Sequence, residues 1–242
     1  MQKALPVVII VIVVLGIIGG GFFAYKQITK PASTIETEEE TETLKELSLE
    51  DKPYTTLVPG PSCEFTLSLS GIQGSPESVE YEIVYKNEEG VTQGASGTIK
   101  ASGESSTKKL LFGTESSGHR RCDKGVSGGN ITIRFRNDEG KLIAKMESSF
   151  SIAEDETELS VKGLKVEGLP SKGKHLAMKT FGLPENAPGK VEYGPFGVFS
   201  NSKSLSGSPK MEGSGTLYGY DGSEWMKISG KTSALEALIL SQ

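Results

Sequence analysis

Residue types that support catalysis or metal binding are few and widely spaced in this sequence. There are two histidines, His119 and His175, and no His-x-x-x-His or Cys-x-x-Cys pair, so the ligand spacing of a zinc site is absent. Residues 125–129 match G-x-S-x-G, but a nucleophile elbow needs a strand before it and a helix after it, and here a loop precedes and a strand follows. Two S-x-x-K matches, which begin at Ser105 and Ser106, precede a strand-like segment instead of a helix. We therefore predict that the protein is not an enzyme, with no catalytic residue, metal or cofactor.

The two cysteines, Cys63 and Cys122, fall in one predicted domain. An even pair in an exported protein is readily interpreted as a disulfide, and two unrelated buried thiols are the alternative. We predict a bridge, which would attach the loop around Cys122 to the strand that begins at Cys63.

The densest basic cluster outside the N-terminal region lies in that loop, at residues 118–125. His119, Arg120, Arg121 and Lys124 could together hold a carboxylate, an anionic sugar or a polymer phosphate, because arginine presents a forked set of donors to such groups. The alternative is a solvated loop with no ligand.

A second candidate binding surface is aromatic. Tyr218, Tyr220 and Trp225 sit among glycines near the C-terminus. Exposed tyrosine and tryptophan rings can stack on sugars or contact peptides, whereas in a small domain the same rings often form the core.

A membrane anchor is the strongest single signal. The segment from Leu5 to Tyr25 has 21 residues without a charged side chain. As a helix it would measure roughly 31 Å, enough to cross a hydrocarbon core of about 30 Å. A cleaved signal peptide is the rival interpretation, but its apolar region is usually shorter and ends in a small-residue cleavage site. We predict an uncleaved transmembrane helix. The Gly16 and Gly20 pair has G-x-x-x-G spacing, so a homodimer is the less favoured alternative to a monomeric anchor.

The orientation follows from the short flank, residues 1–4, which such anchors normally leave in the cytoplasm. We therefore predict a single-pass protein of the cell membrane with its C-terminal body outside. Residues 26–52 are predicted to form an acidic, disordered linker: from Glu36 to Asp51 there are eight acidic residues and one lysine. Such a stretch cannot bury enough apolar surface to offset its ordering entropy.

Beyond the linker the apolar residues recur with a period of two. The alternation runs from Cys63 to Leu69, from Val79 to Tyr85, from Ile131 to Phe135 and from Leu142 to Ile152. One buried and one solvated face is typical of antiparallel sheets, so residues 53–153 are predicted to form a two-sheet β-sandwich. Two similar turns, Asn-Glu-Glu-Gly at 87–90 and Asn-Asp-Glu-Gly at 137–140, are predicted hairpins.

In its strand number, alternation and cysteine separation this region resembles immunoglobulin-like sandwich domains. The resemblance covers residues 53–153 and implies an antiparallel two-sheet fold. The family's core tryptophan and the Tyr-x-Cys pattern before the second cysteine are both absent.

A second small β domain is predicted at 158–242, after a linker at 154–157. Its signals are short apolar alternations and an Asp221-Gly222 turn, and its prolines argue against long helices. The tail from Ser233 to Leu240 fits either a short helix or a final strand.

These elements predict a membrane-anchored extracytoplasmic protein that acts in binding, adhesion or envelope structure. The expected partners are the membrane and an anionic or carbohydrate envelope polymer, or another surface protein. Nucleic acid is not expected, because no domain is strongly basic. The alternative is an extracytoplasmic enzyme, or a subunit that regulates one, with its site between the two β domains.

Overall fold

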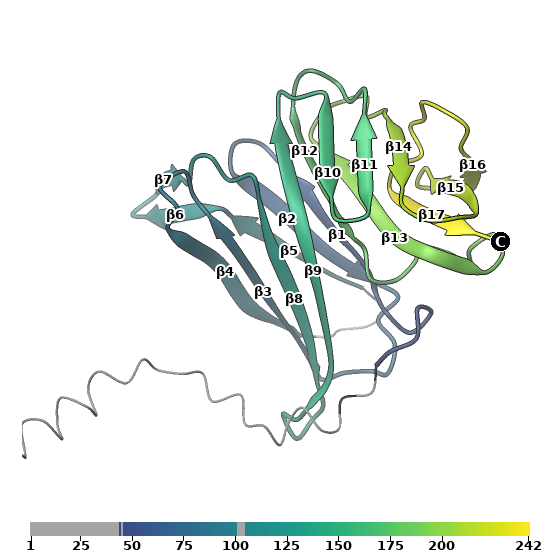
Figure 1. The fold of residues 1–242 in the computed structure, drawn as a ribbon. Helices are drawn as coiled ribbons and strands as arrows, with labels where there is room; N and C mark the ends of the chain where they lie inside the picture. The colour runs from purple at the N-terminus through teal and green to yellow at the C-terminus, as the bar shows by residue number, and fades with distance from the viewer. Residues whose placement is uncertain (1–43, 45, 101–104) are drawn as a thin grey trace, which may run out of the picture. The chain divides into compact units, whose positions relative to one another are not determined.

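The computed structural model describes residues 44, 46–100 and 105–242, and these residues form strands, turns and loops without a helix (Figure 1). This confirms the predicted mostly β class. The predicted transmembrane helix and most of the acidic linker lie outside the described residues. In the part that is described, no helix has the length and apolar character that a membrane span requires.

The largest element is an antiparallel sheet of nine strands, and its order is β16-β15-β17-β13-β12-β9-β8-β3-β4. In that order the strands are Trp225–Lys227, Thr216–Tyr220, Ala237–Ser241, Val191–Ser200, Lys174–Lys179, Leu142–Glu154, Gly128–Arg136, Ser78–Lys86 and Thr92–Lys100.

Three smaller sheets complete the described part of the chain. The first is β1 (Tyr54–Pro59), β2 (Glu64–Ser70) and β5 (Ser105–Leu111). The second is β10 (Glu158–Val161), β11 (Leu164–Glu167) and β14 (Ser208–Met211). The third is the two-stranded hairpin of β6 (Gly113–Ser116) and β7 (His119–Cys122).

The nine-stranded sheet is covered on both faces in its middle, and strand β12 shows this directly. Leu176 and Met178 belong to the apolar cluster that includes the β1-β2-β5 residues, whereas Ala177 belongs to the cluster that includes β10 and β11. Successive side chains of a strand point to opposite faces, so the two three-stranded sheets pack on opposite sides of the large sheet. Strand β12 is therefore buried on both sides, which explains why its sequence shows no alternation.

The strands predicted from strict alternation are present as β2, β3, β8 and β9. The two similar turns are also confirmed as hairpins. In each, the asparagine backbone N–H donates to the carbonyl four residues on, and the asparagine side chain accepts from that same residue's N–H. Gly90 and Gly140 have φ angles of 75° and 76°, a region that glycine adopts without strain. The Asp221-Gly222 turn joins β15 to β16 as predicted, and the C-terminal tail forms strand β17.

The predicted boundary at 154–157 starts at the last residue of β9 and ends just before β10. The two apolar clusters do not divide at this boundary, because the first includes Leu176 and Met178 from after it and the second includes Ala153 from before it, and β9 and β12 pair within one sheet. The division into two domains stays a prediction. Before β1, residues 48–51 form a turn, and Leu47 packs against the first core.

Candidate functional site

The predicted basic loop is in fact a strand. Residues His119 to Cys122 form β7, which pairs with β6 so that Thr114 faces Arg121 and Glu115 faces Arg120. All four residues of β7 are exposed, and both faces of the hairpin meet solvent. The loop prediction was wrong because a strand that is exposed to solvent on both faces shows no alternation of apolar and polar residues.

The base of this hairpin is fixed to the body by a disulfide between Cys63 and Cys122, which confirms the predicted bridge. The backbone N–H of Phe112 donates to the Cys63 carbonyl at 2.9 Å, and the Asp123 N–H donates to the Phe112 carbonyl at 3.0 Å. The Phe112 ring stacks on Phe65 at 4.0 Å between centroids and on Tyr85 at 4.3 Å. A covalent bond, two hydrogen bonds and a stack of three rings therefore hold the hairpin in place.

Tyr85 adds a polar contact to this base. Its hydroxyl donates to the Asp123 carboxylate at 2.9 Å. Burial of the ring, and then the hydrogen bond to this carboxylate, raise the pKa of Tyr85 above its ordinary value. Tyr85 therefore stays a neutral donor across the physiological range.

The four predicted basic residues do not form one site. Arg120 pairs with Glu64 and with Glu115, and these carboxylates raise the pKa of its guanidinium still further. Arg121 lies on the other face of β7, since neighbouring strand residues point in opposite directions. His119 is exposed beside the turn, opposite Ser116.

Arg121 and Lys124 both line a hollow of about 550 Å³ between hairpin β6–β7 and the β3–β4 turn, which we call the hairpin groove. Its lining consists of polar side chains with one apolar residue and one half-cystine: Asn87, Glu88, Glu89, Val91, Gln93, Thr114, Arg121, Cys122, Asp123 and Lys124. The Glu88 N–H donates to the Lys124 carbonyl at 2.8 Å and joins the two walls. The groove thus offers amide, hydroxyl, carboxylate and cationic groups to one ligand.

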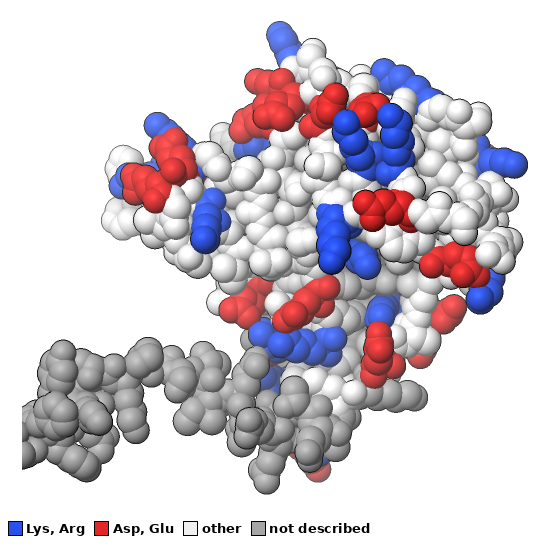
Figure 2. All heavy atoms as spheres, viewed as in Figure 1, with Lys and Arg blue, Asp and Glu red and all other residues white. Residues whose placement is uncertain are grey.

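Charges of both signs are also interspersed elsewhere on the body. On the face shown in Figure 2, acidic and basic side chains lie close to one another in several places, with uncharged surface between them. A ligand of the groove would therefore be selected by local hydrogen bonding more than by a long-range field of one sign.

A second hollow, the cystine pocket, shares the segment from Cys122 to Lys124 with the hairpin groove and measures about 300 Å³. Its apolar lining includes Phe65, Phe112 and Ile152 beside the disulfide, and its polar lining includes Glu154 and Lys174.

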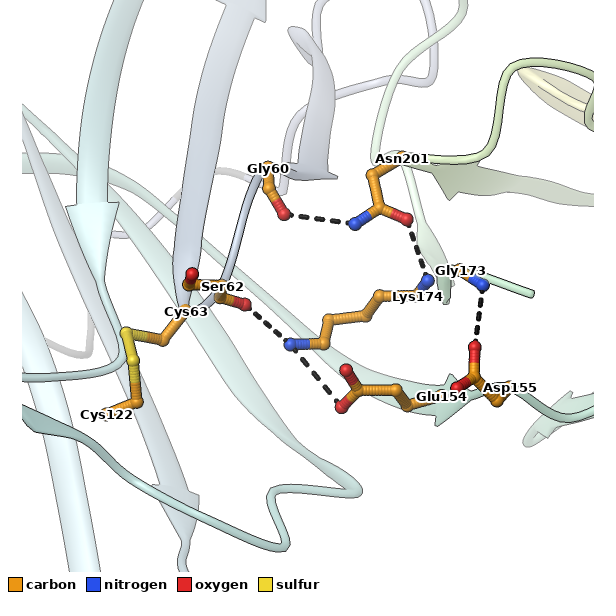
Figure 3. Close-up of polar contacts among 9 residues, drawn as sticks. All are labelled: Gly60, Ser62, Cys63, Cys122, Glu154, Asp155, Gly173, Lys174 and Asn201. Atoms are coloured by element: carbon orange, nitrogen blue, oxygen red, sulfur yellow. Dashed lines mark hydrogen bonds and ion pairs between the residues drawn. A yellow bond between two sulfur atoms is a disulfide. The ribbon is translucent and has the colours of Figure 1, made fainter.

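Lys174 is the central polar group of this pocket (Figure 3). Its ammonium donates to the Ser62 carbonyl at 2.8 Å, lies 3.6 Å from the Glu154 carboxylate, and sits 5.8 Å from the centroid of the Phe65 ring. Its backbone N–H donates to the Asn201 side chain at 2.8 Å, and that side chain donates to the Gly60 carbonyl at 3.1 Å.

These contacts cross-link the β1–β2 turn to strands β9 and β12. The Gly173 N–H also donates to the Asp155 carboxylate at 2.8 Å, which fixes the segment that precedes β12. No sequence pattern indicated this pocket, because its polar residues come from segments far apart in the chain and match no motif.

The predicted aromatic surface lies on β15 and β16, at the opposite end of the nine-stranded sheet from β4. The Tyr220 ring is buried at 6% exposure and lies 5.4 Å from the Trp225 ring, while Tyr218 and Trp225 are half-buried. Burial, and then a hydrogen bond with Glu185, raise the pKa of Tyr220. Among the described residues, the indole Nε1 of Trp225 is the buried side-chain polar atom that lacks a hydrogen-bond partner.

His175, the other histidine, is a buried structural residue. Its Nε2 lies 2.8 Å from the Pro170 carbonyl and its Nδ1 lies 2.9 Å from the Ser200 hydroxyl. A carbonyl only accepts, so Nε2 carries the proton and Nδ1 accepts from Ser200. Within residues 44, 46–100 and 105–242, no three histidine, cysteine, aspartate or glutamate side chains gather closely enough to hold a metal ion.

No protein-family model, no curated protein and no solved structure matches this chain. A functional assignment therefore depends on the geometry of the hairpin groove and the cystine pocket.

Proposed function

We propose that this protein is a membrane-anchored, extracytoplasmic binding module, and that the hairpin groove is its ligand site. In this proposal the segment from Leu5 to Tyr25 spans the membrane, the acidic linker separates it from the body, and the β body, immunoglobulin-like in its first half, presents the groove. The favoured ligand is a polar envelope polymer that carries anionic groups, such as an acidic polysaccharide.

One observation carries the proposal: Arg121 and Lys124 line the same groove as the amides of Asn87 and Gln93 and the carboxylates of Glu88, Glu89 and Asp123, which can accept from sugar hydroxyl groups. Arginine and lysine donate to carboxylates and phosphates, and amide side chains exchange hydrogen bonds with hydroxyl groups. Acidic polysaccharides present both kinds of group along one chain. The disulfide at the end of β7 keeps the β6–β7 wall in position, which lowers the ordering cost of binding.

The disulfide also supports the proposed location. Such bonds persist in oxidising compartments and are rare in the cytosol of mesophiles. This favours a body that faces outside.

A second candidate function is an extracytoplasmic enzyme or enzyme regulator, and the cystine pocket is the observation that favours it. The pocket takes residues from both predicted domains, with Phe65 and Ile152 on one side of the boundary and Lys174 on the other. A lysine and a carboxylate beside an apolar floor can orient a small ligand.

The test uses the full chain in lipid nanodiscs, passed over immobilised polyglucuronate and over neutral dextran. We expect retention on polyglucuronate to fall about three- to tenfold in the Arg121→Ser/Lys124→Ser variant, since two exposed ionic contacts contribute up to about 1 kcal/mol each.

The matched control is Arg120→Ser/Lys172→Ser, which loses the same charge at exposed positions outside the groove. Retention should stay near that of the wild type, and the melting temperature should change little in either variant. Equal losses in both variants would show that only net charge matters, and an unchanged Arg121→Ser/Lys124→Ser variant would refute the groove as the site.

A further inference from the structure

Strand β4 forms one outer edge of the nine-stranded sheet and is long for an edge strand. It runs over nine residues, Thr92–Lys100, and pairs with β3 on one side; within the described residues, no strand pairs with its other side. Its central residues, from Gly94 to Gly97, are glycine, alanine and serine. Long unpaired edge strands can pair with another chain, and proteins usually prevent this with short strands, prolines, charged side chains or a covering segment.

The other edge strands of the described sheets are all guarded. Strand β16 has three residues, β6, β7 and β10 have four each, and β14 contains Pro209. Strand β1 is covered, since its Thr55 N–H donates to the Thr180 carbonyl at 2.8 Å. Strand β5 carries two exposed lysines, Lys108 and Lys109. From Thr92 to Ile99, strand β4 has neither proline nor charge.

The hairpin register identifies the backbone groups on this free edge. The Asn87 N–H donates to the Val91 carbonyl, so that pair is hydrogen-bonded, and bonded pairs alternate along an antiparallel ladder. The odd-numbered residues of β4 therefore bond inward to β3. The even-numbered residues Thr92, Gly94, Ser96 and Thr98 direct their N–H and C=O groups outward, and all four are exposed. This row repeats about every 6.8 Å, which matches the backbone of an extended polypeptide.

The charges around the edge select the kind of chain. Exposed Lys86 ends β3 beside it, and β5, which contacts β4, presents Lys108 and Lys109. The carboxylates of Glu80 and Glu82, opposite Thr98 and Ser96 on β3, are ion-paired with Arg136 and Arg134, and Glu88 and Glu89 lie in the turn before Thr92. A second copy of this protein, paired through its own β4, would present an edge strand without a charge from Thr92 to Ile99, and would therefore give these lysines no partner. An acidic strand would be attracted instead.

We propose that β4 is a strand-addition site for an extended, acidic segment of a partner polypeptide. Main-chain hydrogen bonds from Thr92, Gly94, Ser96 and Thr98 hold the added strand, and the neighbouring lysines favour glutamate or aspartate at alternate positions. This surface is separate from the binding of polysaccharide in the hairpin groove, and the two can fail independently.

The experiment measures deuterium exchange across residues 92–100 of the full chain in nanodiscs, with an alternating threonine–glutamate peptide as the probe. The peptide should slow exchange in this segment. Ser96→Pro removes one outward N–H and leaves the inward ladder to β3 intact, so we expect the peptide to bind roughly fivefold more weakly or worse. Ser96→Ala is the matched control and should bind as the wild type does. Thr98→Pro serves as a second edge variant if Ser96→Pro does not fold.

Two further peptides separate backbone recognition from side-chain recognition. An alternating threonine–lysine peptide and a backbone N-methylated threonine–glutamate peptide should both fail to protect the segment. The proposal would be overturned if either of these peptides protected the segment as well as the threonine–glutamate probe does. It would also be overturned if both proline variants bound that probe as tightly as the wild type. Self-association of the wild type that the proline variants abolish would assign the edge to a second copy and would also overturn it. The Arg121→Ser/Lys124→Ser variant should bind the probe normally.

Discussion

Removal of the disulfide is the sharpest test of how the hairpin is held. The bond joins residues separated by 59 positions, so its loss frees a long loop in the unfolded chain. In the chain-entropy model, a loop of this size corresponds to about 4 kcal/mol of unfolding free energy. For a body of this size, that loss lowers the melting temperature by roughly 8–16 °C.

The native state should survive this loss. The Phe112 ring remains stacked on Phe65 and Tyr85, and its N–H still bonds the Cys63 carbonyl. We therefore expect the reduced protein to keep its β signal in circular dichroism while it melts earlier.

The assay compares thermal unfolding of the oxidised full chain, the same protein after reduction, and the Cys63→Ala/Cys122→Ser variant. Reduction changes no other atom, so it isolates the constraint, whereas the variant also alters the buried Cys63 position. The reduced protein and the variant should melt within a few degrees of each other. A shift below about 2 °C in both would refute the loop-closure reasoning, and loss of the β signal at room temperature would show that the bond holds the native state itself.

Three further outcomes are expected. Gly182→Ala should destabilise the body by roughly 1–3 kcal/mol, because its new Cβ would lie 1.9 Å from the Lys52 carbonyl oxygen. The control Gly230→Ala has open space around its new Cβ and should change stability by no more than about 0.5 kcal/mol. Equal melting temperatures of the two variants would contradict this expectation. The Glu167 carboxylate lies 2.7 Å from the ammonium groups of Lys165 and Lys210, which lower its pKa to about 2. Its contribution to stability is therefore present above pH 4.5 and is lost as the pH falls toward 2. Glu167→Gln should flatten the dependence of stability on pH in that window, and parallel pH profiles of the variant and the wild type would refute the pairing. Protease added outside intact cells should remove the body, and digestion only after permeabilisation would reverse the predicted orientation.

The parts of the fold that were predictable from sequence are those with one wet and one dry face. Strands β2, β3, β8 and β9 alternate because each packs one side on a core, and the asparagine–glycine turns mark their hairpins. Strand β12 was not predicted, since packing on both faces removes the alternation and leaves a continuous buried run. Strand β7 was not predicted either, for the opposite reason: neither of its faces is buried, so its sequence also lacks alternation.

The candidate site was predicted only in part. The basic residue types around Cys122 were found from composition, but alternation within β7 directs Arg120 to Glu64 and Glu115 and leaves Arg121 to the groove. That distinction depends on the strand assignment, which the sequence did not reveal. The cystine pocket depends on pairing between distant strands, and no local pattern encodes such pairing.

The cystine also determines how the body would carry mechanical tension. A pull between the N-terminal end of the body and Lys124 runs along the chain only as far as Cys63 and then crosses the sulfur atoms to Cys122. Residues 64–121 lie within the closed loop and bear none of that tension, so β2, β3, β4 and β5 cannot be extended by it. A ligand that pulls on the groove near Lys124 would therefore load a short covalent path through the disulfide, while the strands within the closed loop keep their shape.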